Sequence, residues 1–359
     1  MKKAIRATII FLIIIYLLLL IIFSEKISVY VLNSIKSCIT LIIPSLYIFM
    51  VTSDFIITSN IYVLLAKPFS FISRYIFKIP EQFFPVYLIS NIGGYPIGVK
   101  LISDMFKENK IDHATAENMI NYCYLSGPAF IFGLVGTNIF SDIRVGVLIF
   151  ISIVSSNFII AFIIGIGNNI PTNYVYTTDL ELTIEKLIIS VYNGGKSIFR
   201  ICTIIIFFSS IICIIDNCGI ISLLADWIEF FTKSDYATAV TIIKAFIEIS
   251  NISLFDANLN NVPLICSLLS FGGLCIIFQI KSIAIGFSLK QFIFFRLVAM
   301  ILSYLICKLL CFITYDLILS ASSIAYTPHS QNSPITTLFL LIMTILFLLK
   351  FSIEKERKI

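Results

Sequence analysis

Long uninterrupted blocks of apolar residues constrain the fold of this chain more than any other feature. Examples are Ala7–Phe23, Val145–Gly167, Ile198–Ile215 and Ile335–Leu349. Each is close to the roughly 20 residues that a helix needs to cross a hydrocarbon core. The blocks are apolar throughout, whereas strands of a membrane barrel alternate. Only 13% of the residues are charged, against roughly 25% in soluble domains. The sequence therefore predicts an all-α polytopic membrane protein.

Eight of the predicted elements are transmembrane helices. They cover residues 7–23, 38–58, 113–140, 145–167, 198–215, 263–280, 291–317 and 335–349. The helix at 113–140 is interrupted at Ser126-Gly127-Pro128, and the helix at 263–280 at Ser270-Phe271-Gly272-Gly273. No small-residue cleavage site follows the first apolar block, so we expect that block to be kept as a membrane helix.

Four other segments complete the predicted topology. The stretches 61–80 and 218–234 carry basic or aromatic residues, and each is predicted to be a helix along the membrane interface. The segments 83–105 and 236–261 are predicted to be re-entrant hairpins. Each arm of the first has about ten residues, which reach only the bilayer midplane. Non-helical backbone at that depth needs cover from protein or from a water-filled cavity.

The distribution of basic residues supports this topology. Regions predicted to be cytoplasmic hold fifteen of them, and the opposite loops hold four. This positive-inside bias predicts that both termini are cytoplasmic. The cytoplasmic set is Lys2, Lys3, Arg6, Lys67, Arg74, Lys78, Lys107, Lys110, Lys186, Lys281, Lys290, Lys350, Lys355, Arg357 and Lys358, and the opposite set is Lys26, Lys36, Arg144 and Lys233.

The order of interfacial stretch, hairpin and broken helix occurs twice, in residues 61–140 and 218–280. The two hairpins are predicted to come from opposite sides, which makes an inverted repeat. Secondary transporters with such repeats bind substrate at the midplane between broken helices. The alternative is a chance coincidence, because Gly and Pro interruptions are common in membrane helices. The other predicted regions are two N-terminal helices in 1–60, connecting helices in 141–217, and C-terminal helices with a basic tail in 281–359.

Five motifs resemble those of the YlbJ (SpoVV) family of sporulation integral membrane proteins. They are Pro44-Ser45-Leu46-Tyr47-Ile48-Phe49, Gly94-Tyr95-Pro96-Ile97-Gly98-Val99-Lys100, Ser126-Gly127-Pro128-Ala129-Phe130-Ile131-Phe132-Gly133, Ile247-Glu248-Ile249-Ser250-Asn251 and Leu269-Ser270-Phe271-Gly272-Gly273-Leu274. The resemblance covers roughly residues 1–315. It implies membership of the nucleoside-recognition, or Gate-domain, group, whose fold is similar to that of concentrative nucleoside transporters. It also implies transport of dipicolinate across the outer forespore membrane during sporulation.

Three positions depart from the pattern of that family. Gly93 stands where the family usually has Ser, Gly127 where it usually has Asn, and Ile252 where Gly is expected. These departures affect the transfer of exact ligand contacts more than the transfer of the fold.

The hairpin tips and broken helices supply the predicted substrate-binding residues. Dipicolinate is a flat dianion, so its site needs positive potential, directional donors and an apolar slot. Half-helix N-termini offer free N–H groups and a positive dipole end, and glycines let backbone approach a ligand closely. The predicted set is Gly93, Gly94, Tyr95, Pro96, Gly98, Lys100, Ser126, Gly127, Pro128, Glu248, Ser250, Asn251, Ser270, Gly272 and Gly273.

Two charged residues of this set have alternative roles. Lys100 is the sharpest candidate for binding a carboxylate, because a charge in a membrane segment is costly and tends to mark function. It could equally pair with Asp104, one helical turn further on. Glu248 could accept a coupling proton or help to hold a cation. It could instead form a structural ion pair with Lys244.

Three further basic residues lie outside the repeats. Arg200 and Arg296 are explained by extension of their side chains toward the membrane surface. Lys308 is deeper in its predicted helix, and the sequence offers no explanation for it.

Other functional classes have little support in the sequence. The nine cysteines form no C-x-x-C pair, and no H-E-x-x-H or G-x-S-x-G motif occurs. We therefore expect no metal site, no cofactor and no enzymatic activity. The expected partners are the lipid bilayer and a small anionic solute, with a coupling ion and an oligomeric assembly left open, and no nucleic acid. A nucleoside-type transporter and a non-transporting structural or sensing subunit of a sporulation membrane complex are the alternatives.

Overall fold

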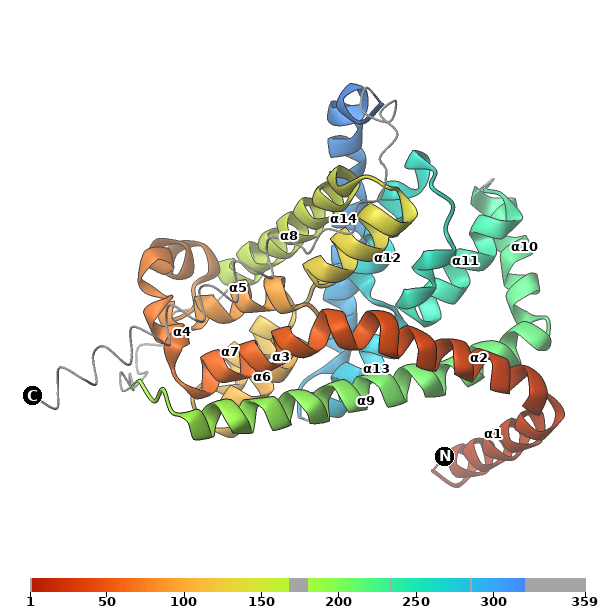
Figure 1. Cartoon of the computed structure of the whole chain (residues 1–359), viewed down its shortest axis with the longest axis horizontal. Helices are drawn as coiled ribbons and strands as arrows, with labels where there is room; N and C mark the ends of the chain where they lie inside the picture. Colours follow the sequence, from red (N-terminus) through yellow and green to blue (C-terminus); the bar gives the residue numbers. More distant parts are fainter. Residues whose placement is uncertain (1, 168–179, 233, 285, 320–359) are drawn as a thin grey trace, which may run out of the picture. The chain divides into compact units, whose positions relative to one another are not determined.

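The computed structural model describes residues 2–167, 180–232, 234–284 and 286–319. Every secondary-structure element in these ranges is helical, which confirms the all-α class (Figure 1). Five helical runs within them are long and apolar enough to cross a membrane: Ser24–Thr58, Ile143–Ile166, Ile184–Asn217, Leu259–Ile283 and Leu289–Thr314. The chain thus has the helices of a polytopic membrane protein. The predicted helix at 335–349 and the basic tail lie outside the described residues.

The N-terminal part contains one helix and one longer helical run. Helix α1 (Lys2–Ile22) matches the first predicted helix. The run consists of α2 (Ser24–Ser37), the π-helical η1 (Cys38–Ile42) and α3 (Ile43–Thr58). The predicted helix at 38–58 therefore begins earlier, at Ser24. The sequence did not predict α2 because its residues are too polar to resemble a membrane helix. Its packing against a later helix, α9, stabilises it in the fold.

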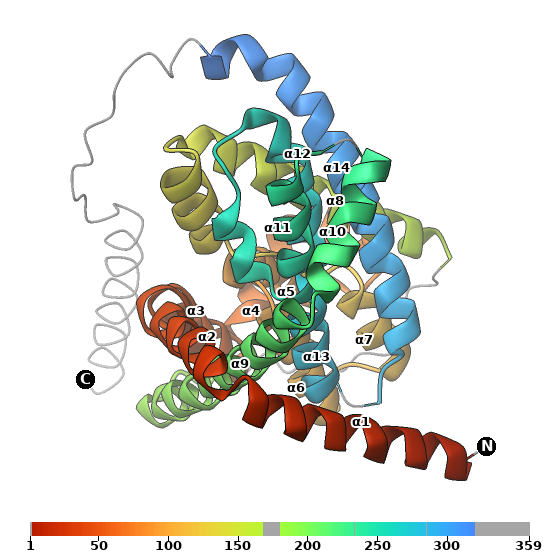
Figure 2. The same cartoon turned by 90° about the vertical axis from the view of Figure 1, so that its right-hand side faces the viewer.

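Helix α9 (Ile184–Asn217) runs alongside α2 and α3 in the opposite direction (Figures 1 and 2). The predicted helix at 198–215 is its apolar portion. Its polar beginning is fixed by Thr183, whose side chain accepts a hydrogen bond of 3.3 Å from the backbone N–H of Lys186. A Cβ atom at Gly194 would lie 2.7 Å from a methyl carbon of Val51, so glycine lets α9 approach α3 closely.

The stretch predicted as one interfacial helix at 61–80 is a series of short helices. These are α4 (Ile61–Leu64), η2 (Lys67–Phe69) and η3 (Ile72–Phe77), followed by η4 (Glu81–Phe83). Pro68 and Pro80 each lack the backbone N–H that a continuous helix requires. Lys78 adopts a left-handed conformation with φ 49°, which also ends a helix.

Helices α5 (Phe84–Gly93) and α6 (Ile97–Lys107) pack against each other around a tight turn. Gly94 has φ +75°, and the Tyr95–Pro96 peptide bond is cis. The segment predicted as the first re-entrant hairpin thus consists of two helices joined by a turn. We call residues 94–96 the first tip.

The predicted break in the helix at 113–140 is longer than expected. Helix α7 (His113–Ile120) is capped by Asp112, whose carboxylate accepts from the backbone N–H of Thr115 at 3.0 Å. Residues 121–127 are then non-helical, and π-helical η5 (Ala129–Ile139) follows. We call residues 121–127 the first break. Helix α8 (Ile143–Ile166) matches its prediction closely.

The second half contains α10 (Ile220–Thr232), α11 (Tyr236–Ile247), α12 (Val262–Phe271), α13 (Gly273–Ile283) and α14 (Leu289–Leu319). Gly272, with φ +84°, separates α12 from α13, so the interruption lies where it was predicted. We call residues 270–273 the second break. Residues 248–251, just after α11, form the second tip.

The second predicted hairpin differs from the first in its returning arm. Residues 249–261 form two short 3₁₀-helices, η6 (Ile249–Leu254) and η7 (Leu259–Asn261), instead of an α-helix. This segment is rich in Asn, and the side chain of Asn258 accepts a hydrogen bond from the backbone N–H of Asn260 at 3.0 Å. Such local hydrogen bonds compete with regular helix formation.

Candidate functional site

The first tip crosses the first break at very short range. The backbone N–H of Tyr95 donates to the carbonyl of Leu125 at 2.6 Å. The rings of Tyr95 and Tyr124 stack with centroids 4.9 Å apart. A Cβ atom at Gly94 would lie 2.4 Å from the backbone nitrogen of Gly127. These glycines therefore allow two segments of the chain to touch.

The second break is joined to the first break and to α11. The hydroxyl of Tyr124 donates to the carbonyl of Phe271 at 2.9 Å. A Cβ atom at Gly272 would lie only 1.9 Å from that hydroxyl oxygen. On the other side, a Cβ atom at Gly273 would lie 3.2 Å from the carbonyl oxygen of Ala245, near the end of α11. Both breaks and both tips thus form one contiguous cluster.

A small pocket lies between the first tip, the first break and the second tip, beside α13, and we call it the central pocket. Its volume is about 30 Å³, the space of about one water molecule. It is lined by Ile42, Leu46, Tyr95, Ser126, Gly127, Phe130, Ile201, Ile205, Glu248, Ile249, Ser250, Ile276 and Gln279. Five residues predicted to bind substrate are among them.

Glu248 is the charged group of the central pocket and is 4% exposed. Its carboxylate accepts hydrogen bonds from the backbone N–H of Ser250 at 3.1 Å and from the hydroxyl of the same residue. The side-chain amide of Asn251 also donates to it at 3.3 Å. The second tip therefore folds around this carboxylate.

Other polar atoms of the cluster are buried without a hydrogen-bond partner among the described residues. They are the hydroxyl oxygens of Tyr95, Ser126 and Ser270 and the amide oxygen of Gln279. The Gln279 amide nitrogen is held by the sulfur of Cys275 at 3.5 Å, which leaves its oxygen available. Buried polar atoms are normally satisfied, so these atoms are suited to a polar ligand or water.

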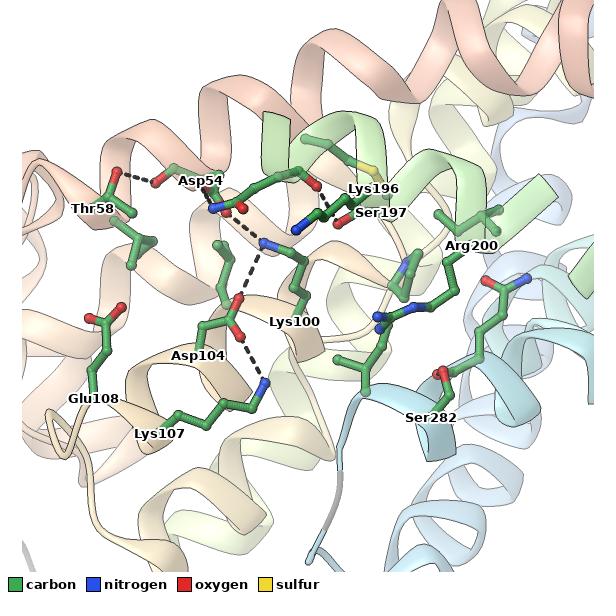
Figure 3. A pocket seen from close by; sticks show the side chains of 18 residues that line it. Asp54, Thr58, Lys100, Asp104, Lys107, Glu108, Lys196, Ser197, Arg200 and Ser282 are labelled. Atoms are coloured by element: carbon green, nitrogen blue, oxygen red, sulfur yellow. Dashed lines mark hydrogen bonds and ion pairs between the residues drawn. The ribbon is translucent and has the colours of Figure 1, made fainter. Parts of the chain in front are cut away.

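A larger open cavity of about 470 Å³ adjoins the central pocket (Figure 3). We call it the vestibule. Its walls come from α3, α6, α9 and α13, and it shares Ile201 and Gln279 with the central pocket. Its charged lining residues are Asp54, Lys100, Asp104, Lys107, Glu108, Lys196 and Arg200.

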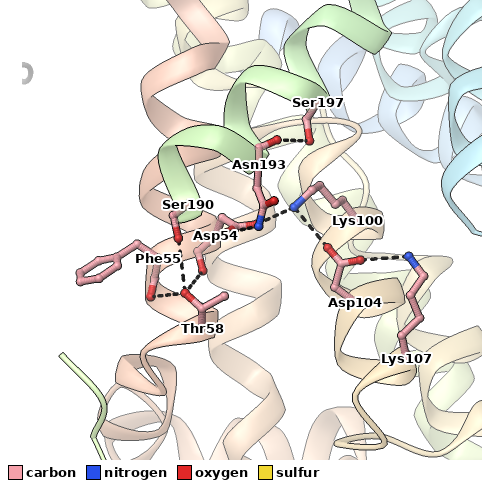
Figure 4. A network of polar contacts seen from close by, with 9 residues as sticks. All are labelled: Asp54, Phe55, Thr58, Lys100, Asp104, Lys107, Ser190, Asn193 and Ser197. Atoms are coloured by element: carbon pink, nitrogen blue, oxygen red, sulfur yellow. Dashed lines mark hydrogen bonds and ion pairs between the residues drawn. The ribbon is translucent and has the colours of Figure 1, made fainter. Parts of the chain in front are cut away.

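Lys100 is tied into an ion-pair network across the vestibule (Figure 4). Its amino group lies 2.6 Å from the carboxylate of Asp54 and 3.2 Å from that of Asp104. Asn193 donates to the second oxygen of Asp54 at 3.2 Å, and Lys107 lies 3.1 Å from Asp104. The pair with Asp104 was an alternative read from the sequence. The contact with Asp54 was missed, because the two residues are far apart in the chain.

The other residues predicted to bind substrate also lie at the cluster, where most of them contact other parts of the chain. Pro96 lines the vestibule. A Cβ atom at Gly93 would touch Ile97, and one at Gly98 would lie 2.3 Å from the carbonyl of Cys123. Pro128 directly precedes η5. Asn251 donates to the carbonyl of Glu248 at 2.9 Å, at the end of α11.

The proposed ion pair between Lys244 and Glu248 is wrong. Lys244 instead lies 2.7 Å from Asp216, which also accepts a hydrogen bond from Tyr30. Helix α11 ends at Ile247, and Glu248 has extended backbone angles. The side chains of Lys244 and Glu248 therefore do not share a helix face.

Arg296 is not the surface-directed side chain that the sequence predicts, because it is 0% exposed. Its guanidinium donates to the carbonyl of Asn121, and to the carbonyl of Tyr124 and the side chain of Asn157 at 3.3 Å each. It also lies 4.8 Å from the centre of the Tyr124 ring. Arg296 thus donates to two carbonyls of the first break, and that of Tyr124 also accepts a hydrogen bond from the side chain of Asn157 at 2.7 Å.

Among the described residues no group of three or more His, Cys, Asp or Glu side chains is placed to hold a metal ion. The polar and charged side chains of the central pocket and the vestibule are suited to binding a polar or charged solute through hydrogen bonds and ion pairs.

The chain is similar to the sporulation integral membrane protein YlbJ of Bacillus subtilis (strain 168). The two are 32% identical over 111 residues, which is 30% of this chain and 26% of the relative. The match thus spans about a quarter of the relative's length. No protein-family model matches the chain. No solved structure matches it either. The apolar helices indicate an integral membrane location, and the relative is itself named an integral membrane protein.

Proposed function

We propose that this chain transports a small anionic solute across a membrane, with dipicolinate as the first candidate. The observation that carries the proposal is the small central pocket, which lies between the first tip, the first break and the second tip, contains the buried carboxylate of Glu248 and adjoins the larger, charged vestibule. Broken helices around a central polar site are typical of secondary transporters. Dipicolinate is proposed because of the motifs that resemble the YlbJ (SpoVV) family, and the relative of similar sequence is named a sporulation integral membrane protein.

The proposal includes a topology. Eight membrane spans, two re-entrant hairpins in an inverted repeat and cytoplasmic termini would place both tips near the bilayer midplane. In a spore-forming cell the protein would act in the outer forespore membrane. The domain division at 61–140 and 218–280 belongs to the same proposal.

A neutral, nucleoside-type solute is the second candidate, and one observation favours it. The central pocket contains the carboxylate of Glu248, which repels an anion and accepts hydrogen bonds from hydroxyl groups. The amide of Gln279 and the hydroxyl of Ser126 would serve a neutral polar solute equally well.

The test is uptake of labelled dipicolinate, and in parallel of labelled uridine, into liposomes that contain the purified full-length chain. The informative variant is Gln279→Leu, because Gln279 lies at the junction of the two cavities. We expect it to lower uptake about tenfold, the effect of removing one buried hydrogen bond to solute.

Gln291→Leu is the matched control, since Gln291 lies in the first turn of α14, outside both cavities. Uptake of uridine but not dipicolinate would select the second candidate. Uptake of neither, by protein that is folded and inserted, would contradict transport of these solutes and favour a structural or sensing subunit.

A further inference from the structure

We propose that Arg200 and Lys196 of α9, rather than Lys100, receive the carboxylates of a small dicarboxylate in the vestibule. This inference rests on the proposed function and adds a binding site to it. The site is the wall of the vestibule that α9 forms, and its ligand is a dianion with two closely spaced carboxylates (Figure 3).

Lys100 is already occupied by two carboxylates of the chain. Its amino group lies between Asp54 of α3 and Asp104 of α6, and Asn193 of α9 holds Asp54 from the other side. A solute that bound Lys100 would have to displace one of these partners. We assign Lys100 the role of a positioning residue that links α3 with α6.

Helix α9 presents a polar stripe to the vestibule. Asn193, Lys196, Ser197 and Arg200 all line the cavity. Their spacing of three and four residues puts them on one helix face. Figure 3 shows the side chain of Arg200 reaching from α9 into the cavity, toward the wall that carries Ser282 of α13.

The positive charge of this stripe is uncompensated. The acidic residues of the vestibule are paired elsewhere: Asp54 and Asp104 with Lys100, and Glu108 with Lys110 at 2.8 Å. Among the described residues neither Lys196 nor Arg200 forms an ion pair with a carboxylate. The amino group of Lys196 lies 4.4 Å from the centre of the Tyr192 ring, a cation–π contact that does not neutralise its charge.

The spacing of the two cations fits a dicarboxylate. Side chains four residues apart on a helix have Cβ atoms about 5–6 Å apart. The guanidinium of Arg200 can bind one carboxylate with two parallel hydrogen bonds, and Lys196 can bind the other as a point charge. The free amide oxygen of Gln279 lies beyond them, where the vestibule meets the central pocket.

The inference is tested by equilibrium binding of dipicolinate, and of the monocarboxylate picolinate, to the full-length protein in lipid nanodiscs. The variants are Arg200→Gln and Lys196→Gln. Lys281→Gln is the matched control, because Lys281 is an exposed lysine of α13 that does not line the vestibule. Thermal unfolding of each variant checks that it is folded.

We expect each vestibule variant to weaken dipicolinate binding roughly 10- to 100-fold, the effect of losing a charge-assisted contact. Picolinate engages one cation at a time, so each variant should weaken its binding much less. The Arg200→Lys variant should bind dipicolinate with intermediate affinity, because lysine keeps the positive charge but cannot donate two parallel hydrogen bonds to one carboxylate. The control should bind both acids as the wild type does.

Three results separate this inference from the proposed function. Dipicolinate binding by Arg200→Gln within about twofold of wild type, in a protein that takes up dipicolinate, would overturn the inference and keep transport. No dipicolinate binding by wild type would overturn it too, and uptake of uridine would then keep transport. Binding that depends on Arg200 in a protein without uptake would support the binding site and contradict transport.

Discussion

Arg296 illustrates how a break in a membrane helix is stabilised by a distant residue. The carbonyls of Asn121 and Tyr124 have no helical partner, because α7 ends at Ile120. Arg296 supplies donors from α14 and places a positive charge beyond the negative end of α7. A planar group with five donors suits several acceptors at once.

Replacing this side chain should destabilise the protein strongly. Arg296→Met keeps an apolar stem but removes the donor to the buried carbonyl of Asn121 and to the side-chain oxygen of Asn157, while Asn157 still donates to the carbonyl of Tyr124. We expect a loss of roughly 3 kcal/mol or more, since each buried unsatisfied group costs about 1–3 kcal/mol. Thermal unfolding in detergent measures it. Lys290→Met, an exposed change on the same helix, is the control, and an equal effect of both changes would contradict this role.

At the residue scale the sequence predicts local contacts and misses distant ones. The i,i+4 pair of Lys100 with Asp104 is present, because helix geometry brings the two together. The partner Asp54 and the burial of Arg296 depend on how separate helices pack, which a sequence pattern does not reveal. Lys244 and Glu248 have the same spacing, but the helix ends between them.

At the scale of elements, the crossing of the first tip and the first break depends on glycine. Gly94 has φ +75°, which disfavours any side chain, and its α-carbon faces the backbone of Gly127. The interruptions were predictable from Gly and Pro. Their lengths were not, because residues 121–127 leave the helix through tertiary contacts.

A single methyl group should disrupt this crossing. Gly94→Ala would place a carbon 2.4 Å from the nitrogen of Gly127 and strain the backbone. We expect a loss of about 2 kcal/mol or more, from the combined strain and overpacking. Gly195→Ala is the control, because a Cβ atom there meets nothing within 4 Å and alanine favours a helix. Equal melting temperatures of the two variants would show that the crossing is not rigid.

At the scale of the whole molecule, the class of protein was predictable from the length of the apolar segments, and the topology was predicted from the charges between them. Apolar length alone identifies helices that can cross a membrane. The prediction of the side of the membrane on which each loop lies is based on the distribution of basic residues in the sequence. The two predicted repeats differ in the returning arm of their hairpins, since Asn-rich residues 249–261 form 3₁₀-helices.

Labelling with a membrane-impermeant thiol reagent tests that topology. Asn109 lies between α6 and α7 and Asn260 lies in η7, and both are exposed. In a Cys218→Ser background, which removes the exposed cysteine, we expect Asn109→Cys to react only from the cytoplasmic side and Asn260→Cys only from the opposite side. Reaction of both from one side would contradict the predicted topology.

The small volume of the central pocket also has a kinetic consequence. On the proposed transport route, a solute larger than one water molecule can occupy this pocket only after the first tip, the first break and the second tip move apart. Each passage then requires one opening and one closing of the protein. Collective motions of this kind take microseconds to seconds. The transport rate would therefore saturate as the solute concentration rises, and no channel-like conductance would be seen. The conformational turnover of the protein, rather than diffusion of the solute, would limit the rate.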